Sequence, residues 1–69
     1  MITNYTVTGM TCEHCVNHVT EEVEALDGVQ AVKVQLEGGS MAVTSDAEID
    51  FAVITEAVAE AGDYTVAKN

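Results

Sequence analysis

Hydrophobic residues recur at helical spacing in two stretches of the chain. In the first stretch, at positions i, i+3, i+7 and i+10, they are Val16, Val19, Val23 and Leu26. The second stretch repeats this spacing with Phe51, Ile54, Val58 and Ala61. A stripe of this kind is typical of an amphipathic helix that buries one face. The pattern therefore predicts helices over residues 11–26 and 51–61.

Four other stretches have the residue types and the alternation of β-strands. They cover residues 2–8, 29–36, 41–44 and 64–66. Tyr5 and Val7 share one face of the first strand. Val32, Val34 and Leu36 share one face of the second. Each of these two strands is thus expected to turn one side toward a core.

Turn and cap residues separate these elements. Asp50 is placed to cap the second helix, because a carboxylate at that position accepts a bond from a free N–H group. Gly28 and Gly62 follow the two helices, as glycines at helix ends often do. Gly38-Gly39 predicts a hairpin turn, since glycine reaches positive φ at little cost.

The predicted order of elements is βαββαβ, the split βαβ or ferredoxin-like arrangement. We expect an α+β sandwich in which two helices cover one face of a four-stranded antiparallel sheet. The chain has 69 residues, no proline and no low-complexity segment. It is therefore expected to form a single domain over residues 1–69.

The charge of the chain is strongly acidic. Twelve acidic residues against two lysines give a formal net charge of −10. Such a field repels phosphate backbones and anionic lipids, so neither nucleic-acid binding nor membrane binding is expected. It suits docking to a basic patch on a protein partner, or solubility alone. No membrane span or signal peptide is recognisable, which predicts a cytoplasmic protein with reduced thiols.

Both cysteines of the chain, Cys12 and Cys15, lie where the first helix is expected to begin. The free N–H groups and the positive end of a helix favour a thiolate there and lower the pKa of the thiol. Soft sulfur ligands select soft ions, Cu(I) first, with Zn(II), Cd(II) and Hg(II) as alternatives. Two thiolates suit Cu(I) or Hg(II), whereas a closed zinc site needs four ligands.

Two histidines offer further ligands close to the cysteines. His14 lies between Cys12 and Cys15 and is expected to point outward. His18 is expected roughly 60° from Cys15 around the helix. One of the two histidines can reach an ion on the thiolates, but both together would require distortion. A four-ligand site is therefore the less favoured arrangement.

The stretch Gly9-Met10-Thr11-Cys12-Glu13-His14-Cys15 resembles the GMTCxxC motif of heavy-metal-associated domains. This family includes soluble bacterial copper chaperones and the N-terminal domains of copper-transporting P-type ATPases. The resemblance covers essentially the whole chain and includes the predicted order of elements. It implies that Cys12 and Cys15 bind Cu(I). It also implies that the ion passes by thiolate ligand exchange to the metal-binding domain of a copper-transporting P-type ATPase.

Four residues are candidates for supporting or tuning the thiol site: Met10, Thr11, His14 and Tyr64. The resemblance places Met10 in the core beneath the loop. The position of Tyr64 departs from the family, because bacterial members often have Gly-Tyr directly after the second helix. Here the order is Gly62-Asp63-Tyr64. Either the loop absorbs one residue and Tyr64 reaches the thiols, or Asp63 occupies that place.

Other functions remain open for the same pair of thiols. A thioredoxin-like redox role fits a CxxC at a helix start, but the short chain and the absence of proline argue against it. A domain handling Hg(II), Zn(II) or Cd(II), or one excised from a metal-transporting ATPase, would carry the same motif. Met1 directly before the first strand favours a free-standing protein.

No catalytic constellation or phosphate-binding loop is recognisable, so the protein is not expected to be an enzyme. We expect a monomer without metal. A copper-bridged dimer is an alternative once the thiolates are loaded.

Overall fold

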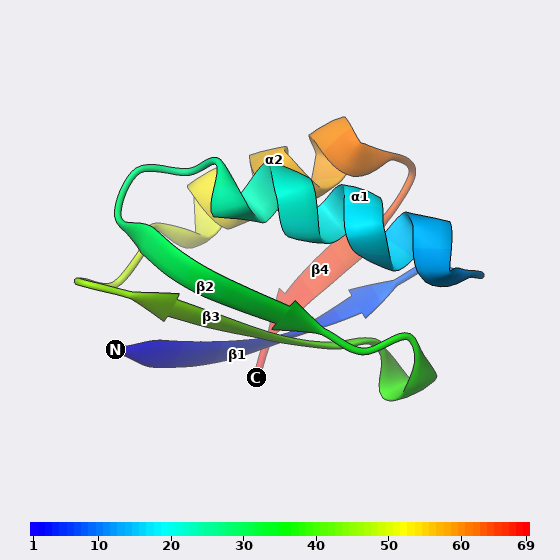
Figure 1. Ribbon diagram of the computed structural model, residues 1–69, viewed down its shortest axis with the longest axis horizontal. Coiled ribbons are helices and arrows are strands. Elements are labelled where there is room, and N and C mark those ends of the chain that lie inside the picture. The colour runs from blue at the N-terminus through cyan, green and yellow to red at the C-terminus, as the bar shows by residue number, and fades with distance from the viewer.

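Four strands and two helices form two layers in the computed structural model, which describes residues 1–69 (Figure 1). Their bounds are β1 (Ile2–Thr8), α1 (Glu13–Glu24), β2 (Val29–Val34), β3 (Ser40–Ser45), α2 (Phe51–Ala61) and β4 (Thr65–Lys68). The sheet has the order β2-β3-β1-β4, and all of its pairings are antiparallel. Both helices cover the same face (Figure 1). The predicted ferredoxin-like sandwich is therefore confirmed.

The core lies between the two layers. Its fully buried members come from both helices and from the two central strands, and they are Tyr5, Val7, Val19, Val23, Met41, Val43, Ile54, Ala57 and Val58. The predicted stripe of α1 is confirmed, because Val16, Val19 and Val23 are all buried. Leu26 lies beyond the helix and packs against the core half-buried.

The stripe predicted for α2 was wrong at Phe51, which remains 38% exposed. Phe51 is the first residue of α2, and its ring stacks on Tyr5 with centroids 6.2 Å apart and an interplanar angle of 11°. Ala57 takes a buried position instead, beside Ile54 and Val58.

The first helix, α1, is shorter at both ends than predicted. The helix expected over residues 11–26 covers Glu13–Glu24. It begins later because Cys12 is an extended N-cap residue, with φ −158° and ψ 172°. It ends at Glu24 with Ala25 as its C-cap, so Gly28 belongs to the following turn, where its φ is +87°.

Three strands also differ in their bounds from the prediction, and one of them is β3, which covers Ser40–Ser45 in place of residues 41–44. β2 stops at Val34, and Leu36 leads into the 3-10 turn η1 (Glu37–Gly39) of the β2–β3 hairpin. The hairpin depends on Gly39, where an added Cβ would lie 2.2 Å from the carbonyl oxygen of Val7. The last strand covers Thr65–Lys68, so Tyr64 precedes it.

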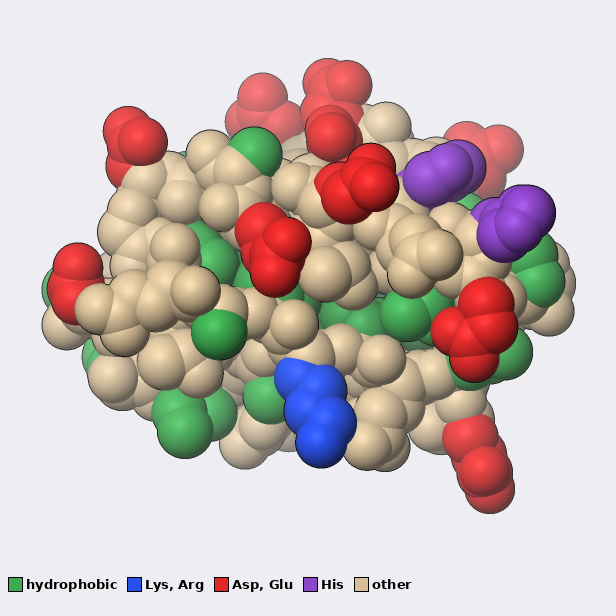
Figure 2. Space-filling model, viewed as in Figure 1, with side chains coloured by type: hydrophobic (Ala, Val, Ile, Leu, Met, Phe, Trp, Pro, Cys, Tyr) green, Lys and Arg blue, Asp and Glu red, His purple; other side chains and the backbone are tan.

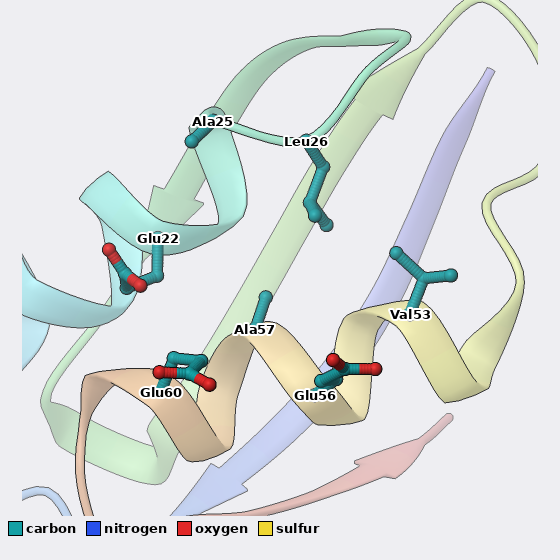
Figure 3. Close-up of a pocket in the computed structure, with 7 residues that line it drawn as sticks. All are labelled: Glu22, Ala25, Leu26, Val53, Glu56, Ala57 and Glu60. Atoms are coloured by element: carbon teal, nitrogen blue, oxygen red, sulfur yellow. The ribbon is translucent and has the colours of Figure 1, made fainter.

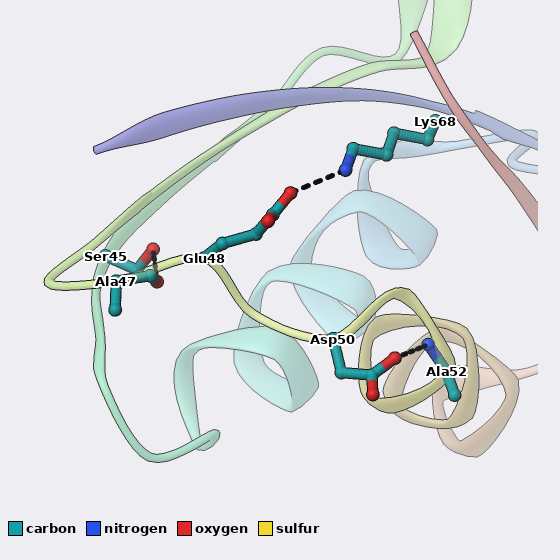
Figure 4. Close-up of polar contacts among 6 residues, drawn as sticks. All are labelled: Ser45, Ala47, Glu48, Asp50, Ala52 and Lys68. Carbon is teal, nitrogen blue, oxygen red and sulfur yellow. Dashed lines mark hydrogen bonds and ion pairs between the residues drawn. The ribbon is translucent and has the colours of Figure 1, made fainter.

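Polar contacts hold the connection from β3 to α2 (Figure 4). The carboxylate of Asp50 accepts a hydrogen bond of 3.0 Å from the Ala52 N–H, which confirms the predicted N-cap. Glu48 forms an ion pair of 2.7 Å with Lys68 of β4. Of these contacts, the Asp50 cap marks where α2 starts.

The acidic residues occupy only helices, loops and turns, whereas both lysines lie on strands. Figure 2 shows carboxylates spread over the helical layer. Six of the twelve lie on the two helices, four of them on α1, whose first turn carries Cys15.

Candidate metal centre

The two thiols lie on the loop from β1 to α1 and on the first turn of the helix. Cys12 is exposed and Cys15 is half-buried, and both are free. The N–H groups of Cys15 and Val16 donate to the Cys12 carbonyl oxygen, at 3.0 and 3.4 Å, and close the first turn. This turn brings the two sulfur atoms to 3.7 Å from each other. Two metal–sulfur bonds of about 2.3 Å can span about 4.6 Å, so one ion can contact both sulfurs.

Hydrogen bonds make the Cys15 thiol acidic. A backbone hydrogen bond from Thr11 and one from the Tyr64 phenol lower its pKa to about 6, against the opposing effect of burial. The Thr11 hydroxyl, 3.8 Å from the sulfur, and the backbone of Cys12 add smaller contributions in the same direction. Cys15 is therefore largely a thiolate at neutral pH, the form that binds soft metals.

Tyr64 reaches the thiols despite the additional residue before it. The Tyr64 N–H donates to the Gly62 carbonyl oxygen at 2.9 Å, so a three-residue turn takes up Asp63. Asp63 itself is exposed. The Tyr64 pKa is raised, first by its hydrogen bond to Cys15 and then by partial burial and the nearby negative charges. Of the two arrangements that the sequence allowed, the structure shows the one with Tyr64 at the site.

Two glycines make room for the Tyr64 ring, and the sequence did not indicate this function for either. A Cβ on Gly62 would lie 2.8 Å from Cε2 of the ring, and one on Gly9 would lie 3.2 Å from Cδ1. Gly9 and Gly62 are 53 positions apart in the chain (62 − 9), so no local pattern links them. The only sequence signal was that Gly9 is the first residue of the cysteine motif and that Gly62 lies two positions before Tyr64.

The other candidate site residues lie either against the core or on the surface. Met10 is half-buried and packs against the core cluster, whereas Thr11 is exposed and contacts Cys15. His14 and His18 are both exposed. No group of three or more histidine, cysteine, aspartate or glutamate side chains is arranged to hold a metal ion. The structure therefore does not assemble the four-ligand site of two thiols and two histidines.

A separate hollow of about 320 Å³ lies between the two helices (Figure 3). Its lining includes Ala25 and Leu26, which follow the C-terminal end of α1, so it lies away from the cysteines. Three carboxylates, from Glu22, Glu56 and Glu60, surround apolar side chains there. The molecule has a second hollow, lined in part by His18, and no cysteine lines either of the two.

The fold and the paired thiols together define a class: a small ferredoxin-like domain with two cysteines converging at the start of its first helix. The profile of the heavy-metal-associated domain family matches residues 4–63. The chain belongs to the heavy-metal-associated domain family. No helix in it has both the length and the apolar character that a membrane span requires.

Three proteins illustrate the similarity. The copper chaperone CopZ of Bacillus subtilis is 46% identical over 63 residues, which cover 90% of each chain. The yeast copper transporter domain Ccc2a, studied in apo and Cu(I)-loaded states, superposes with a TM-score of 0.86 and 26% identity, covering 99% of this chain and 93% of that one. A mercuric reductase of Shewanella putrefaciens is 32% identical over 56 residues, covering 81% of this chain but 10% of the reductase.

Proposed function

We propose that this protein is a copper chaperone that carries one Cu(I) ion between Cys12 and Cys15. The observation that carries this proposal is the pair of free sulfurs 3.7 Å apart on an exposed loop. The 46% identity to a copper chaperone of matching length supports copper as the cargo. In this proposal residues 1–69 act as one domain and as a non-enzymatic carrier in the cytoplasm.

Loading requires little proton transfer and no change of oxidation state. Cys15 is already largely a thiolate at neutral pH, so its sulfur bonds the ion directly. Cys12 supplies the second sulfur–copper bond, and any proton on its sulfur passes to water as that bond forms. The Thr11 and Tyr64 contacts hold the Cys15 sulfur in place while this happens. Met10 fastens the loop to the core from below.

Release follows from the low number of protein ligands. Two thiolates leave coordination positions of Cu(I) open, and Cys12 is exposed to an incoming group. A thiolate of the partner forms a third sulfur–copper bond, after which one bond to this protein breaks and then the other. The ion passes without being freed, and each departing sulfur is replaced by one of the partner.

The partner that this scheme fits best is the metal-binding domain of a copper-transporting P-type ATPase. Support comes from the similarity to the yeast copper transporter domain, which has the same fold. The acidic helical layer adjoins the thiols, so the docking face of the partner is expected to be basic. Transfer should then slow as salt is added, and a rate insensitive to salt would argue against this docking mode.

The decisive experiment is a Cu(I) titration of the reduced protein against a chromophoric Cu(I) chelator. We expect one Cu(I) per chain, lost in the C12S and C15S variants. The T44S variant is the control, since the half-buried Thr44 pairs with Ile2 at the start of β1, whereas the thiols follow the end of β1. Stoichiometric binding that survives both cysteine substitutions would overturn the proposal. Sedimentation of the same samples tests for the monomer without metal and for the copper-bridged dimer.

The similarity to a mercuric reductase supports a second candidate, the handling of Hg(II), and Zn(II) and Cd(II) are further soft ions to test. The geometry favours a two-coordinate soft ion, because the structure gathers no third or fourth protein ligand. Competitive titration of the reduced protein distinguishes the ions. A preference for Zn(II) over Cu(I) would replace copper as the cargo.

A further inference from the structure

We propose that His14 and His18 form a second metal site, on the exposed face of α1, for a borderline divalent cation of the Zn(II), Ni(II) or Cu(II) type. This site is separate from the thiol pair and does not depend on the copper proposal. The two imidazoles are its only protein ligands, and water fills the remaining coordination positions.

The helix brings the two histidines together. Both lie within α1, four residues apart. Residues at i and i+4 are neighbours on one helix face, with Cβ atoms about 5–6 Å apart, so one ion can bridge their side chains. Figure 2 shows both imidazoles projecting next to each other from the same side of the molecule. Histidines at this spacing on a helix are a recognised zinc-binding pair.

Neither imidazole has another role in the fold. Both side chains are exposed, and neither makes a hydrogen bond or an ion pair within the chain. Their rings are therefore free to rotate toward a common ion at the cost of side-chain entropy alone. A buried or bonded histidine would have to break contacts before it could bind.

The chemistry of this pair differs from that of the thiols. Imidazole nitrogen suits Zn(II), Ni(II) and Cu(II), whereas thiolates select Cu(I). His14 follows Cys12 by two positions, yet no three-ligand group joins the histidines to a cysteine. The two sites can thus be loaded with different ions.

The surroundings of His18 attract a cation. His18 lines an open hollow of about 280 Å³ together with Glu21, Glu22 and Glu60. These carboxylates do not complete a ligand set, but their charge raises the local concentration of divalent ions. Water molecules bound to the ion can be held by them in turn.

The experiment uses full-length protein with both cysteines changed to serine, C12S/C15S, so that only the proposed site can bind. Calorimetric titration with Zn(II) is carried out in the presence of excess Mg(II), which occupies purely carboxylate sites. We expect one Zn(II) per chain. Adding H14N or H18N should weaken binding by at least about tenfold, and Zn(II) should raise the melting temperature only where both histidines are present.

The matched control is the swap H18E/E22H in the same cysteine-free background. It preserves composition and charge, and both positions are exposed. It moves the second imidazole to i+8, about 12 Å along the helix from His14, too far for one ion to bridge. We expect it to bind as weakly as H14N. Unchanged affinity in the swap or in H14N, or no saturable binding below about 1 mM, would overturn the proposal.

Discussion

At the scale of single residues, the candidate centre depends on contacts to one sulfur atom. The Cys15 thiolate receives hydrogen bonds from the Thr11 backbone and from the Tyr64 phenol. Tyr64 can lie there only because Gly9 and Gly62 leave space for its ring. The acidity of one cysteine is thus set by residues from both ends of the chain.

Replacing Tyr64 by phenylalanine should raise the pKa of Cys15. The variant loses the phenol hydrogen bond, and the pKa moves up from about 6 toward its ordinary value of 9.0. It should stay below that value because the Thr11 backbone bond, the larger cause, remains. Thiolate absorbance of the reduced, metal-free protein against pH measures this. Y5F is the matched control, and a Cys15 pKa equal in Y64F and wild type would contradict the expectation.

The same thiol predicts how stability depends on pH. The pKa of Cys15 is about 6 in the folded protein, below its ordinary value of 9.0, so the unfolded chain binds more protons between these values. Stability of the metal-free protein should therefore rise with pH over this interval, and the gain is lost as pH falls through about 6. Urea unfolding at several pH values measures the slope, which C15S should reduce. An identical slope in C15S would show that other groups cause it.

At the scale of elements, the start of each helix is set differently. Cys12 caps α1 without a side-chain hydrogen bond, so its thiol stays available. Asp50 caps α2 through its carboxylate, which bonds the Ala52 N–H at 3.0 Å. The first helix thus has no side-chain cap where the thiols lie, whereas in the second a carboxylate pairs with one of the free N–H groups.

Removing the cap of α2 should destabilise the protein. We expect D50A to cost about 1 kcal/mol of unfolding free energy, because the Ala52 N–H loses its partner. The substitution also removes one negative charge from a strongly acidic chain, which acts in the opposite direction. D27A, in an exposed turn, removes the same charge without a cap and corrects for this. Chemical denaturation measures both, and equal stability of D50A and D27A would contradict the prediction.

At the scale of the whole molecule, repulsion between negative charges opposes the stability of the fold. Twelve acidic groups lie on the helices and loops, and Glu22 and Glu60 line both hollows beside the helices. Their mutual repulsion lowers the stability of the isolated protein. The same negative field attracts a basic surface. The charge distribution that lowers stability would therefore favour docking to a partner with such a surface.

Salt should therefore stabilise the metal-free protein. Raising the ionic strength from about 0.01 to about 0.1 M shortens the screening length from about 30 to about 10 Å. Each 1 kcal/mol of relieved repulsion corresponds to an increase of about 4–8 °C in the melting temperature of a domain this small. The E22Q/E60Q variant should have a higher melting temperature at low salt, and added salt should raise that temperature by less. A melting temperature that falls with salt, or an equal response in the variant, would contradict this account.

Features that depend on neighbouring residues could be predicted from the amino-acid sequence. The two helical stripes, the hairpin glycines and the Asp50 cap act within a few positions, and each predicted its element correctly. The pair Cys12 and Cys15 was recognisable for the same reason, because one helical turn brings the two thiols together wherever the helix packs. The βαββαβ order followed from these local elements.

Tertiary structure alone decided the rest. Whether Tyr64 or Asp63 contacts the thiols depends on the turn that precedes Tyr64 and on the space that Gly9 leaves. Gly9 lies in the connection from β1 to α1, whereas Tyr64 lies in the connection from α2 to β4. The exposure of Phe51 likewise depends on where α2 begins over the sheet, since periodicity gives the direction of a side chain but not what covers it. Contacts between residues distant in the chain are made by packing, and packing has no local pattern in the sequence.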